Sequence, residues 1–339
     1  MFKGAEFRDD ERRVRGLPLE ELQRLTRLDP VKASLAVVQT YAVILGCVGA
    51  ALIWWTPWMI VPAIVIIATQ QHALFIIAHD AAHYRLYRSR SLNDLIGRLS
   101  AALVGLSMPT YRVVHRLHHN HLYEDKDPDV ALHGGYPRGR RYLSRKLLLD
   151  LSGVNAWKNY AYFFGAPAIN DAVGESNRPL DDTASALRWA ARRDRWLVVG
   201  LQIAMLVAAV WLGYLLEYLL LWVVPALTVL QPILRLRAIC EHGAVTDYST
   251  PLTAARTNTG PWWLMWLLFP HHVNHHLEHH VYPAIPHYNL PACHRAMRQH
   301  GVFADAEVIP VRETLARVFA DPIGGSRART VARGTRSAR

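Results

Sequence analysis

Residues 33–55 read ASLAVVQTYAVILGCVGAALIWW, and residues 58–78 read WMIVPAIVIIATQQHALFIIA. Neither run contains a charged residue, and each can cross a hydrocarbon core of about 30 Å at about 1.5 Å per helical residue. Only a Thr-Pro pair separates them, which predicts an antiparallel hairpin with tryptophans at an interfacial tip. Residues 196–214 and 218–234 repeat the pattern. The sequence therefore predicts an all-α membrane protein with four transmembrane helices in two hairpins.

The cationic residues predict the orientation of these hairpins. All 38 lysines and arginines lie outside them, and none occurs in residues 33–84 or 196–234. The positive-inside rule then places the hairpin tips outside and every other region, including a histidine-rich helical cap, in the cytoplasm. A soluble protein with two buried helical hairpins is the alternative, which four uncharged runs of this length disfavour.

The expected organisation has three parts. A cytoplasmic N-terminal arm covers residues 1–32, and a membrane domain covers residues 33–322. A basic tail at residues 323–339 carries arginines without an acid, so we expect it to be disordered and able to contact anionic lipid. The three cysteines, Cys47, Cys240 and Cys293, show no paired spacing and predict no disulfide framework.

The chain has 18 histidines, most of them in tight groups. Spacings of three and four residues place side chains on one face of a helix, where they can share a metal ion. Because both hairpins begin and end on the same side, all groups are expected on one face of the membrane. The groups are His79 with His83, His115 with His118 and His119, the run HHVNHHLEHH at residues 271–280, and His242 after the fourth apolar run.

Clustered imidazoles indicate metal chemistry. Close histidines without a metal repel one another when protonated and each need a partner when neutral. All-nitrogen ligation suits iron, zinc or copper better than magnesium or calcium. A zinc site usually has four ligands, often with cysteine, so eight or nine histidines are too many for one such ion.

Several polar residues can be explained without a role in metal binding. The isolated His133, His287, His294 and His300 are expected to be interfacial polar residues without a role. His72 can line a substrate cavity or bond to a neighbouring helix, and the sequence favours neither. The segment EDKDPDV at residues 124–130 has three possible roles. Its carboxylates can contact the metal ligands or the headgroup of a substrate, or the segment is a simple proline-containing turn.

The motifs HDAAH, HRLHH and HHLEHH followed by VYPAIP resemble the three histidine boxes of the integral-membrane fatty acid desaturase and hydroxylase superfamily, over roughly residues 33–300. The resemblance implies a non-haem di-iron centre, with dioxygen as co-substrate, ligated by nine histidines. By motif these are His79, His83, His115, His118, His119, His242, His276, His279 and His280.

Parts of this ligand set have alternatives. The third box can also be read as His272, His275 and His276, but the residues VYPAIP that follow favour the later frame. His242 is included because of the sequence E-H-G at a helix end. Glu241 and Glu278 either orient ligands or are ligands themselves.

The resemblance implies an oxidoreductase. It suggests a desaturase that introduces a double bond into an acyl chain, or else a hydroxylase or ketolase of a lipid, sphingolipid, carotenoid or alkane; family frequency favours the desaturase. A metal transporter is disfavoured because the apolar runs carry no acid at mid-depth.

The electron donor is expected to be a separate protein. The sequence contains neither a haem-binding H-P-G-G motif nor a cysteine set for an iron–sulfur cluster. We therefore expect a ferredoxin or cytochrome b5-type partner, and no nucleic acid. The net charge of +11 has two interpretations. It can attract an acidic donor protein, or the arginines and lysines only fix the orientation in the membrane and bind lipid headgroups. The expected location is a bacterial inner membrane, with the site on the cytoplasmic face.

Overall fold

The structure is a computed structural model that describes residues 16–170, 174–175, 178–180, 183–245 and 247–322. The predicted basic tail and the first part of the N-terminal arm lie outside these residues. The described chain is mostly helical, as predicted. It also contains two small two-stranded ladders, which the all-α prediction did not include.

Four helices are long and apolar enough to cross a membrane, in agreement with the four predicted runs. They are α3 (Pro30–Ile53), α4 (Pro57–Ala82), α10 (Ser185–Trp211) and the segment Leu215–His242. The last segment consists of α11 (Leu215–Tyr218), the π-helix η1 (Leu219–Val223), α12 (Val224–Leu227) and α13 (Leu230–His242). Proline in α12 has no N–H to donate, and the backbone bends at Thr228 (φ −116°, ψ −82°) before α13 begins.

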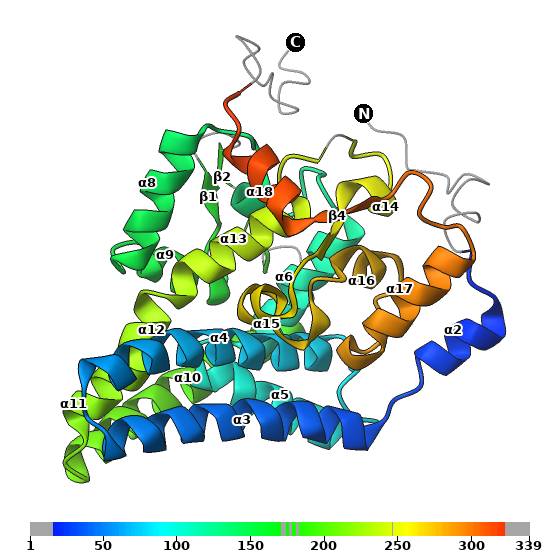
Figure 1. Cartoon of the computed structure of the whole chain (residues 1–339). Helices are drawn as coiled ribbons and strands as arrows, with labels where there is room; N and C mark the ends of the chain where they lie inside the picture. The colour runs from blue at the N-terminus through cyan, green and yellow to red at the C-terminus, as the bar shows by residue number, and fades with distance from the viewer. Residues whose placement is uncertain (1–15, 171–173, 176–177, 181–182, 246, 323–339) are drawn as a thin grey trace, which may run out of the picture.

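Helices α3 and α4 pack along each other in opposite directions (Figure 1). Ala51 near the end of α3 shares an apolar cluster with Ala63 near the start of α4. Ala33 at the start of α3 shares another cluster with Leu74 further along α4. Small side chains at these contacts let the two backbones approach closely. The start of α3 and the histidine-bearing end of α4 therefore lie at the same end of the pair.

All four segments extend beyond the predicted runs at one or both ends, and α3 begins three residues early, at Pro30. Helix α4 continues through residues 79–82, α10 begins eleven residues before residue 196, at Ser185, and the fourth segment ends at His242 rather than at residue 234. A helix does not have to end where its apolar run ends, because polar and charged residues also propagate it. The additional turns carry His79 and His242, which are two of the predicted ligands.

Shorter helices make up much of the rest of the described chain, and several of them pack against α4 or α13 (Figure 1). Before α10 these are α2 (Leu19–Leu25), α5 (Arg90–Leu103), α6 (Met108–Asn120), α7 (Val130–His133), α8 (Arg140–Leu151) and α9 (Ala156–Phe163). After α13 they are α14 (Pro251–Ala254), α15 (Trp262–Leu268), η2 (Pro270–His272), α16 (His276–Val281), η3 (His287–Asn289), α17 (Leu290–Gln299) and α18 (Val311–Phe319).

One of the two ladders fixes the end of α13. Strand β1 (Ile169–Asn170) pairs antiparallel with β2 (Gly174–Glu175), and β3 (Arg256–Thr259) pairs parallel with β4 (Glu307–Pro310). The buried Arg256 of β3 pairs with Glu307 at 3.2 Å and donates to the carbonyl oxygens of Cys240 and Gly243 at 3.2 and 3.0 Å. These bonds satisfy carbonyl groups that the helix end leaves open, and they hold the turn that carries His242.

Candidate metal centre

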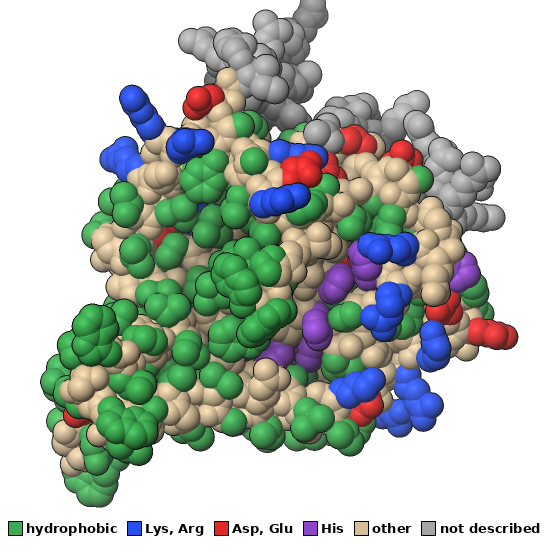
Figure 2. All heavy atoms as spheres, in the orientation of Figure 1, with side chains coloured by type: hydrophobic (Ala, Val, Ile, Leu, Met, Phe, Trp, Pro, Cys, Tyr) green, Lys and Arg blue, Asp and Glu red, His purple; other side chains and the backbone are tan. Residues whose placement is uncertain are grey.

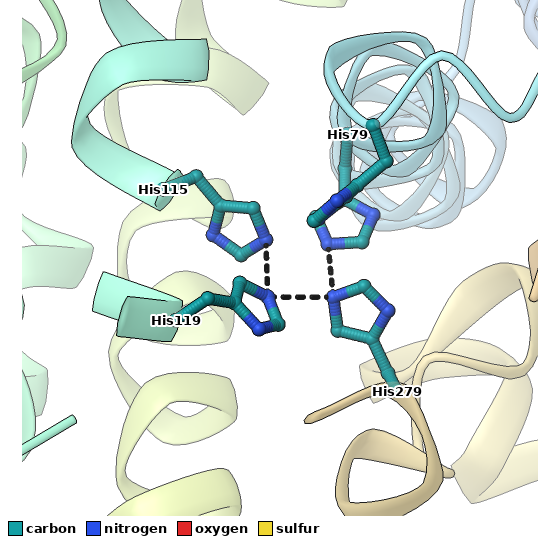
Figure 3. A group of neighbouring side chains, drawn as sticks. His79, His115, His119 and His279 are labelled. Atoms are coloured by element: carbon teal, nitrogen blue, oxygen red, sulfur yellow. Dashed lines mark hydrogen bonds between the residues drawn. The ribbon is translucent and has the colours of Figure 1, made fainter. Parts of the chain in front are cut away.

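The first histidine group brings together three separate elements. It comprises His79 and His83 at the end of α4, His115 and His119 of α6, and His279 of α16. Each pair on one helix is four residues apart, so both rings lie on the same face. Figure 3 shows four of these rings pointing toward one another.

The nitrogen atoms of this group are very close. The Nε2 atom of His279 lies 3.0 Å from that of His79 and 2.9 Å from that of His119. The Nε2 atom of His119 is also 3.0 Å from that of His115 (Figure 3). The Nε2 atom of His83 is buried and has no hydrogen-bond partner among the described residues.

The second histidine group lies beside the first. It comprises His118 of α6, His242 at the end of α13, and His276 and His280 of α16, all buried. The Nε2 atom of His242 is 3.2 Å from that of His118 and 2.8 Å from that of His276, which is 3.1 Å from that of His280. The two groups adjoin because adjacent residues belong to different groups. These are His118 and His119 in α6, and His279 and His280 in α16. The ring centroids of His119 and His280 are only 4.3 Å apart.

Hydrogen bonding alone does not satisfy this arrangement. An imidazole nitrogen has one in-plane position, which holds either a proton or a lone pair, so it makes one hydrogen bond. Yet the Nε2 atoms of His119, His279, His242 and His276 each have two nitrogen neighbours. Two ligands at right angles on a metal with bonds of about 2.1 Å lie about 3.0 Å apart. The residues therefore fit a cation in each group.

The structure brings together all nine histidines that the motifs predict as ligands, five in one group and four in the other. The third box contributes His276, His279 and His280, which is the later of the two frames. His272 belongs to neither group, and His275 instead lies beside Glu278 and His294.

Carboxylates contact the outer nitrogen atoms of several rings. The Nδ1 atom of His118 lies 3.0 Å from Asp127, and that of His79 lies 3.4 Å from Asp80. Asp80 also accepts hydrogen bonds from the backbone N–H and ring Nδ1 of His287, at 2.9 and 2.6 Å. Such partners fix the ring orientation of a ligand and direct its other nitrogen at the metal.

Glu241 and Glu278 lie outside both histidine groups. Glu241 accepts a hydrogen bond from Arg237 at 2.7 Å and lies 3.5 Å from the Nδ1 atom of His276. Glu278 accepts hydrogen bonds from Thr257 and His294. Both positions suit a role in holding α13 and α16 better than direct ligation.

The expectation that four isolated histidines are interfacial polar residues is wrong for three of them. His133, His287 and His294 are buried, and only His300 is exposed, where it pairs with Glu21 at 3.0 Å. His133 is 1% exposed, and its ring lies 4.7 Å from that of His242. Some partners are distant in the chain, as Asp80 is from His287, and sequence spacing gives no sign of those contacts.

The sequence left open the roles of His72 and of the acidic loop at residues 124–130. The structure buries His72 within α4, and neither of its ring nitrogens has a hydrogen-bond partner among the described residues. In the acidic loop, Asp127 contacts His118, and Asp129 accepts a hydrogen bond from the Tyr162 hydroxyl. The loop is therefore part of the surround of the second histidine group rather than a simple turn.

Burial and charge set the protonation of the groups. Burial, reinforced by the neighbouring His79, lowers the pKa of His83 to about 3, so this ring is neutral and able to bind a metal. Burial also lowers the pKa of His115, His119 and His279. His118 differs. Burial alone would lower its pKa, but the charge of Asp127 and its hydrogen bond outweigh burial and raise the pKa to about 9.

A pocket of about 520 Å³ opens onto the first histidine group. His83, His115 and His119 form part of its lining, next to apolar side chains that include Met108 and Val113. Its polar lining includes four arginines, Arg98, Arg112, Arg116 and Arg193, and also Asp94, which pairs with Arg112 at 2.8 Å. The pocket is therefore a route by which a partly apolar molecule can reach the histidines.

Known proteins resemble this chain over most of its length. The family model for fatty acid desaturases matches residues 23–313. Dihydrorhizobitoxine desaturase of Bradyrhizobium elkanii is 29% identical over 80% of this chain and 76% of its own length. The sn-1 oleoyl-lipid 12-desaturase of a Synechocystis species is 26% identical over 76% of this chain and 73% of its own. Zeaxanthin 4-ketolase of Chlamydomonas reinhardtii is 33% identical, but over only 32% of this chain and 26% of its own.

Proposed function

Because the chain belongs to the fatty acid desaturase family, we propose that it is a di-iron, O2-dependent desaturase that introduces a double bond into the acyl chain of a lipid. It is an oxidoreductase, as its relatives are. The observation that carries the proposal is the pair of adjoining imidazole groups, with five and four members. That number exceeds what one structural or hydrolytic zinc ion needs.

In this proposal each histidine group holds one iron ion. When bound, the two irons supply, with dioxygen and external electrons, an oxidant that removes hydrogen from an unactivated C–H bond. The chain itself orients the imidazoles, and burial keeps the ring of His83 neutral. Asp127 directs His118, and the carbonyl oxygen of Ala254, 3.0 Å from the Nδ1 atom of His242, directs that ring.

The substrate reaches the centre through the pocket beside the first histidine group. Met108, Val113 and Leu187 supply an apolar wall suited to an alkyl chain. Arg98 and Arg112 of the same pocket already pair with Asp194 and Asp94, so Arg116 and Arg193 are the arginines suited to a carboxylate or phosphate at the substrate's polar end. The pocket therefore favours a molecule that has both an alkyl portion and an acidic group.

A hydroxylase or ketolase is the second candidate. The partial match to a protein named zeaxanthin 4-ketolase supports it. Both reactions begin with removal of one hydrogen from carbon, and they differ in whether a second hydrogen leaves or oxygen is added. Placement of the substrate carbon decides between them, and the stronger overall coverage of the desaturase relatives favours loss of the second hydrogen.

The proposal includes an orientation and a partner. The four spans form two hairpins, and the histidine-rich cap lies on the cytoplasmic side of a bacterial inner membrane. The arm at residues 1–32 and the basic tail at residues 323–339 lie on that side too. The absence of lysine and arginine from residues 33–84 and 196–234 supports this orientation. Electrons come from a separate ferredoxin or cytochrome b5-type protein, whose acidic surface a chain of net charge +11 would attract.

Two measurements test the proposal. The purified full-length chain should contain about two irons, whereas one tightly held zinc would contradict the di-iron centre. Lipid mass spectrometry of cells that express the chain should show a product lighter by two hydrogens. Cells that express the His118→Ala variant should lack it. A product heavier by one oxygen would identify the hydroxylase instead.

A further inference from the structure

A second pocket lies at the start of α3, and its lining includes none of the nine site histidines. Its volume is about 650 Å³. Five cationic side chains from three parts of the chain surround it: Arg24, Arg27, Lys32, Arg88 and Arg295. Figure 2 shows lysine and arginine side chains gathered on this side of the molecule, where the apolar surface of α3 begins. We call this feature the basic pocket.

The wall of the basic pocket is held in place by contacts between distant segments. The backbone N–H of Asp29 donates to the Tyr288 hydroxyl at 2.7 Å. Asn289 donates to the carbonyl oxygen of Leu25 at 2.8 Å, and Arg88 donates to that of Leu28 at 3.4 Å. The connection between α2 and α3 is therefore fixed before any ligand binds, which lowers the entropic cost of binding.

The positive charge of the basic pocket is largely uncompensated. Asp29 is its one acidic lining residue, and its carboxylate caps α3 by accepting from the backbone N–H groups of Val31 and Lys32, at 3.0 and 3.2 Å. Arg24 pairs with Glu21 at 3.1 Å. In the described chain, Arg27, Arg88 and Arg295 have no acidic partner within 4.0 Å. The site therefore attracts an anion.

An apolar face of α3 begins next to the basic pocket. Val31, Leu35, Val38 and Leu45 are 65%, 62%, 61% and 68% exposed. Their spacing of four, three and seven residues places them on one side of the helix. An anionic group in the pocket would thus be followed directly by a lipid-facing stripe, the arrangement that a phospholipid headgroup and its acyl chains require.

We propose that the basic pocket binds the headgroup phosphate of an anionic phospholipid, whose acyl chains lie along the exposed face of α3. The bound lipid holds the connection between α2 and α3 at the membrane surface. This site is separate from the histidine groups, so its occupancy does not depend on iron, on turnover or on the proposed function.

Lipid retention by the full-length chain tests this proposal. The protein is purified in neutral detergent and given an equimolar mixture of phosphatidylglycerol and phosphatidylcholine with identical acyl chains. Native mass spectrometry then measures which lipid stays bound. The wild type should retain phosphatidylglycerol in preference. The triple variant Arg27→Gln, Arg88→Gln, Arg295→Gln should lose this preference, with affinity falling about fivefold for each arginine removed.

A matched variant controls for total charge. Arg140, Arg141 and Arg312 are exposed and lie outside the basic pocket. Their replacement by glutamine should change retention by less than about twofold. The single variant Arg295→Gln provides a milder test if the triple variant does not fold.

Three results would overturn the proposal. The first is a triple variant that retains phosphatidylglycerol as the wild type does. The second is inorganic phosphate that displaces the lipid and gives the same thermal stabilisation, which would identify a free-phosphate site. The third is a triple variant that retains the lipid but no longer accepts electrons from an acidic donor protein. That result would identify a protein-docking surface.

Discussion

His118 makes a close contact on each side of its ring. Its Nδ1 atom lies 3.0 Å from Asp127, and its Nε2 atom lies 3.2 Å from that of His242. Asp127 is itself fixed, because it accepts hydrogen bonds from the backbone N–H groups of Tyr123 and Asp129 at 3.0 and 2.9 Å. The carboxylate therefore determines which ring nitrogen points into the second histidine group.

Replacement of Asp127 by asparagine should weaken metal binding in this group. The amide keeps the shape of the carboxylate but removes the charge that orients His118 and increases its basicity, so we expect metal affinity to fall by about 10- to 100-fold. Metal content measured after dialysis against a graded chelator gives the affinity. Glu124→Gln removes a nearby carboxylate from an exposed side chain that pairs with His121, and it should leave metal content unchanged. Equal loss in both variants would contradict a specific role for Asp127.

Metal binding to the second histidine group should depend on pH. The pKa of His118 is raised to about 9, so the metal-free ring is protonated at pH 7, and a metal ion must displace that proton. Affinity should therefore rise with pH, by up to about tenfold per unit, until the pH passes the pKa. His83, with a pKa of about 3, is already neutral and adds no such dependence.

Anaerobic Fe(II) titrations at pH 6.5, 7.5 and 8.5 would measure this slope. Asp127→Asn should flatten it, because removal of the carboxylate lowers the pKa of His118 and leaves little proton to displace. If affinity depends on pH equally in the wild type and the variant, the proton that the metal displaces is not on His118.

Sequence spacing predicted which histidines share a helix face. It did not predict the side chains that contact the outer nitrogen atoms of those rings. A separation of three or four residues places two histidines on one helix face whatever the rest of the chain does, so the pairs in α4 and α6 were predictable. The contact between Asp80 and His287 joins residues 207 positions apart, and no local pattern predicts it. The burial of His133 depends in part on contacts of the same kind, since its ring packs against His118 of α6 and His242 of α13 as well as against the nearer Tyr123.

At the scale of elements, the backbone before α16 determines which histidines of the third box lie together. His271 and His272 have positive φ values of 54° and 61°, the left-handed region that non-glycine residues seldom adopt. The contact of His271 with Thr40 of α3, at 2.8 Å, helps to hold this turn. Since α16 starts only at His276, His272 does not share its helical face. The sequence permitted both frames because either one has the same internal spacing.

The contact between α4 and α5 leaves no space for a side chain at Gly97. A Cβ atom there would lie 2.6 Å from the Met108 sulfur and closer still to the Cβ atom of Ala81. Ala81 lies between His79 and His83, so displacement of α5 would disturb the first histidine group. We expect Gly97→Ala to cost about 1–3 kcal/mol of stability through overpacking and to lower metal content.

Gly46→Ala in α3 is the matched control, because nothing lies within 4 Å of the added Cβ atom. It should be neutral or stabilise the helix by up to about 1 kcal/mol. Thermal unfolding in detergent compares the two variants. A Gly97→Ala protein that melts with the wild type and keeps its metal would show that α5 moves freely.

At the scale of the whole molecule, the site depends on the chain returning repeatedly to one end of the long helices. His79 and His279 are 200 positions apart, and their Nε2 atoms are 3.0 Å apart. Because α3 and α4 run in opposite directions, the chain comes back to its starting level before the first box. Span length and charge placement predict this return, but not the bend at Thr228 or the clamp of β3 on α13, which depend on tertiary contacts.

The proposed orientation makes a final prediction about reagent access. Thr56 follows α3, and Tyr214 follows α10, and both are exposed, as is Ser249 beyond the histidine-bearing end of α13. A membrane-impermeant maleimide added to intact cells should label Thr56→Cys and Tyr214→Cys, because both tips face outward. It should label Ser249→Cys only after lysis. The wild type, whose Cys240 and Cys293 are buried, gives the background. The reverse pattern would invert the orientation, and labelling at only one tip would contradict two hairpins, since the histidine groups would then be divided across the membrane.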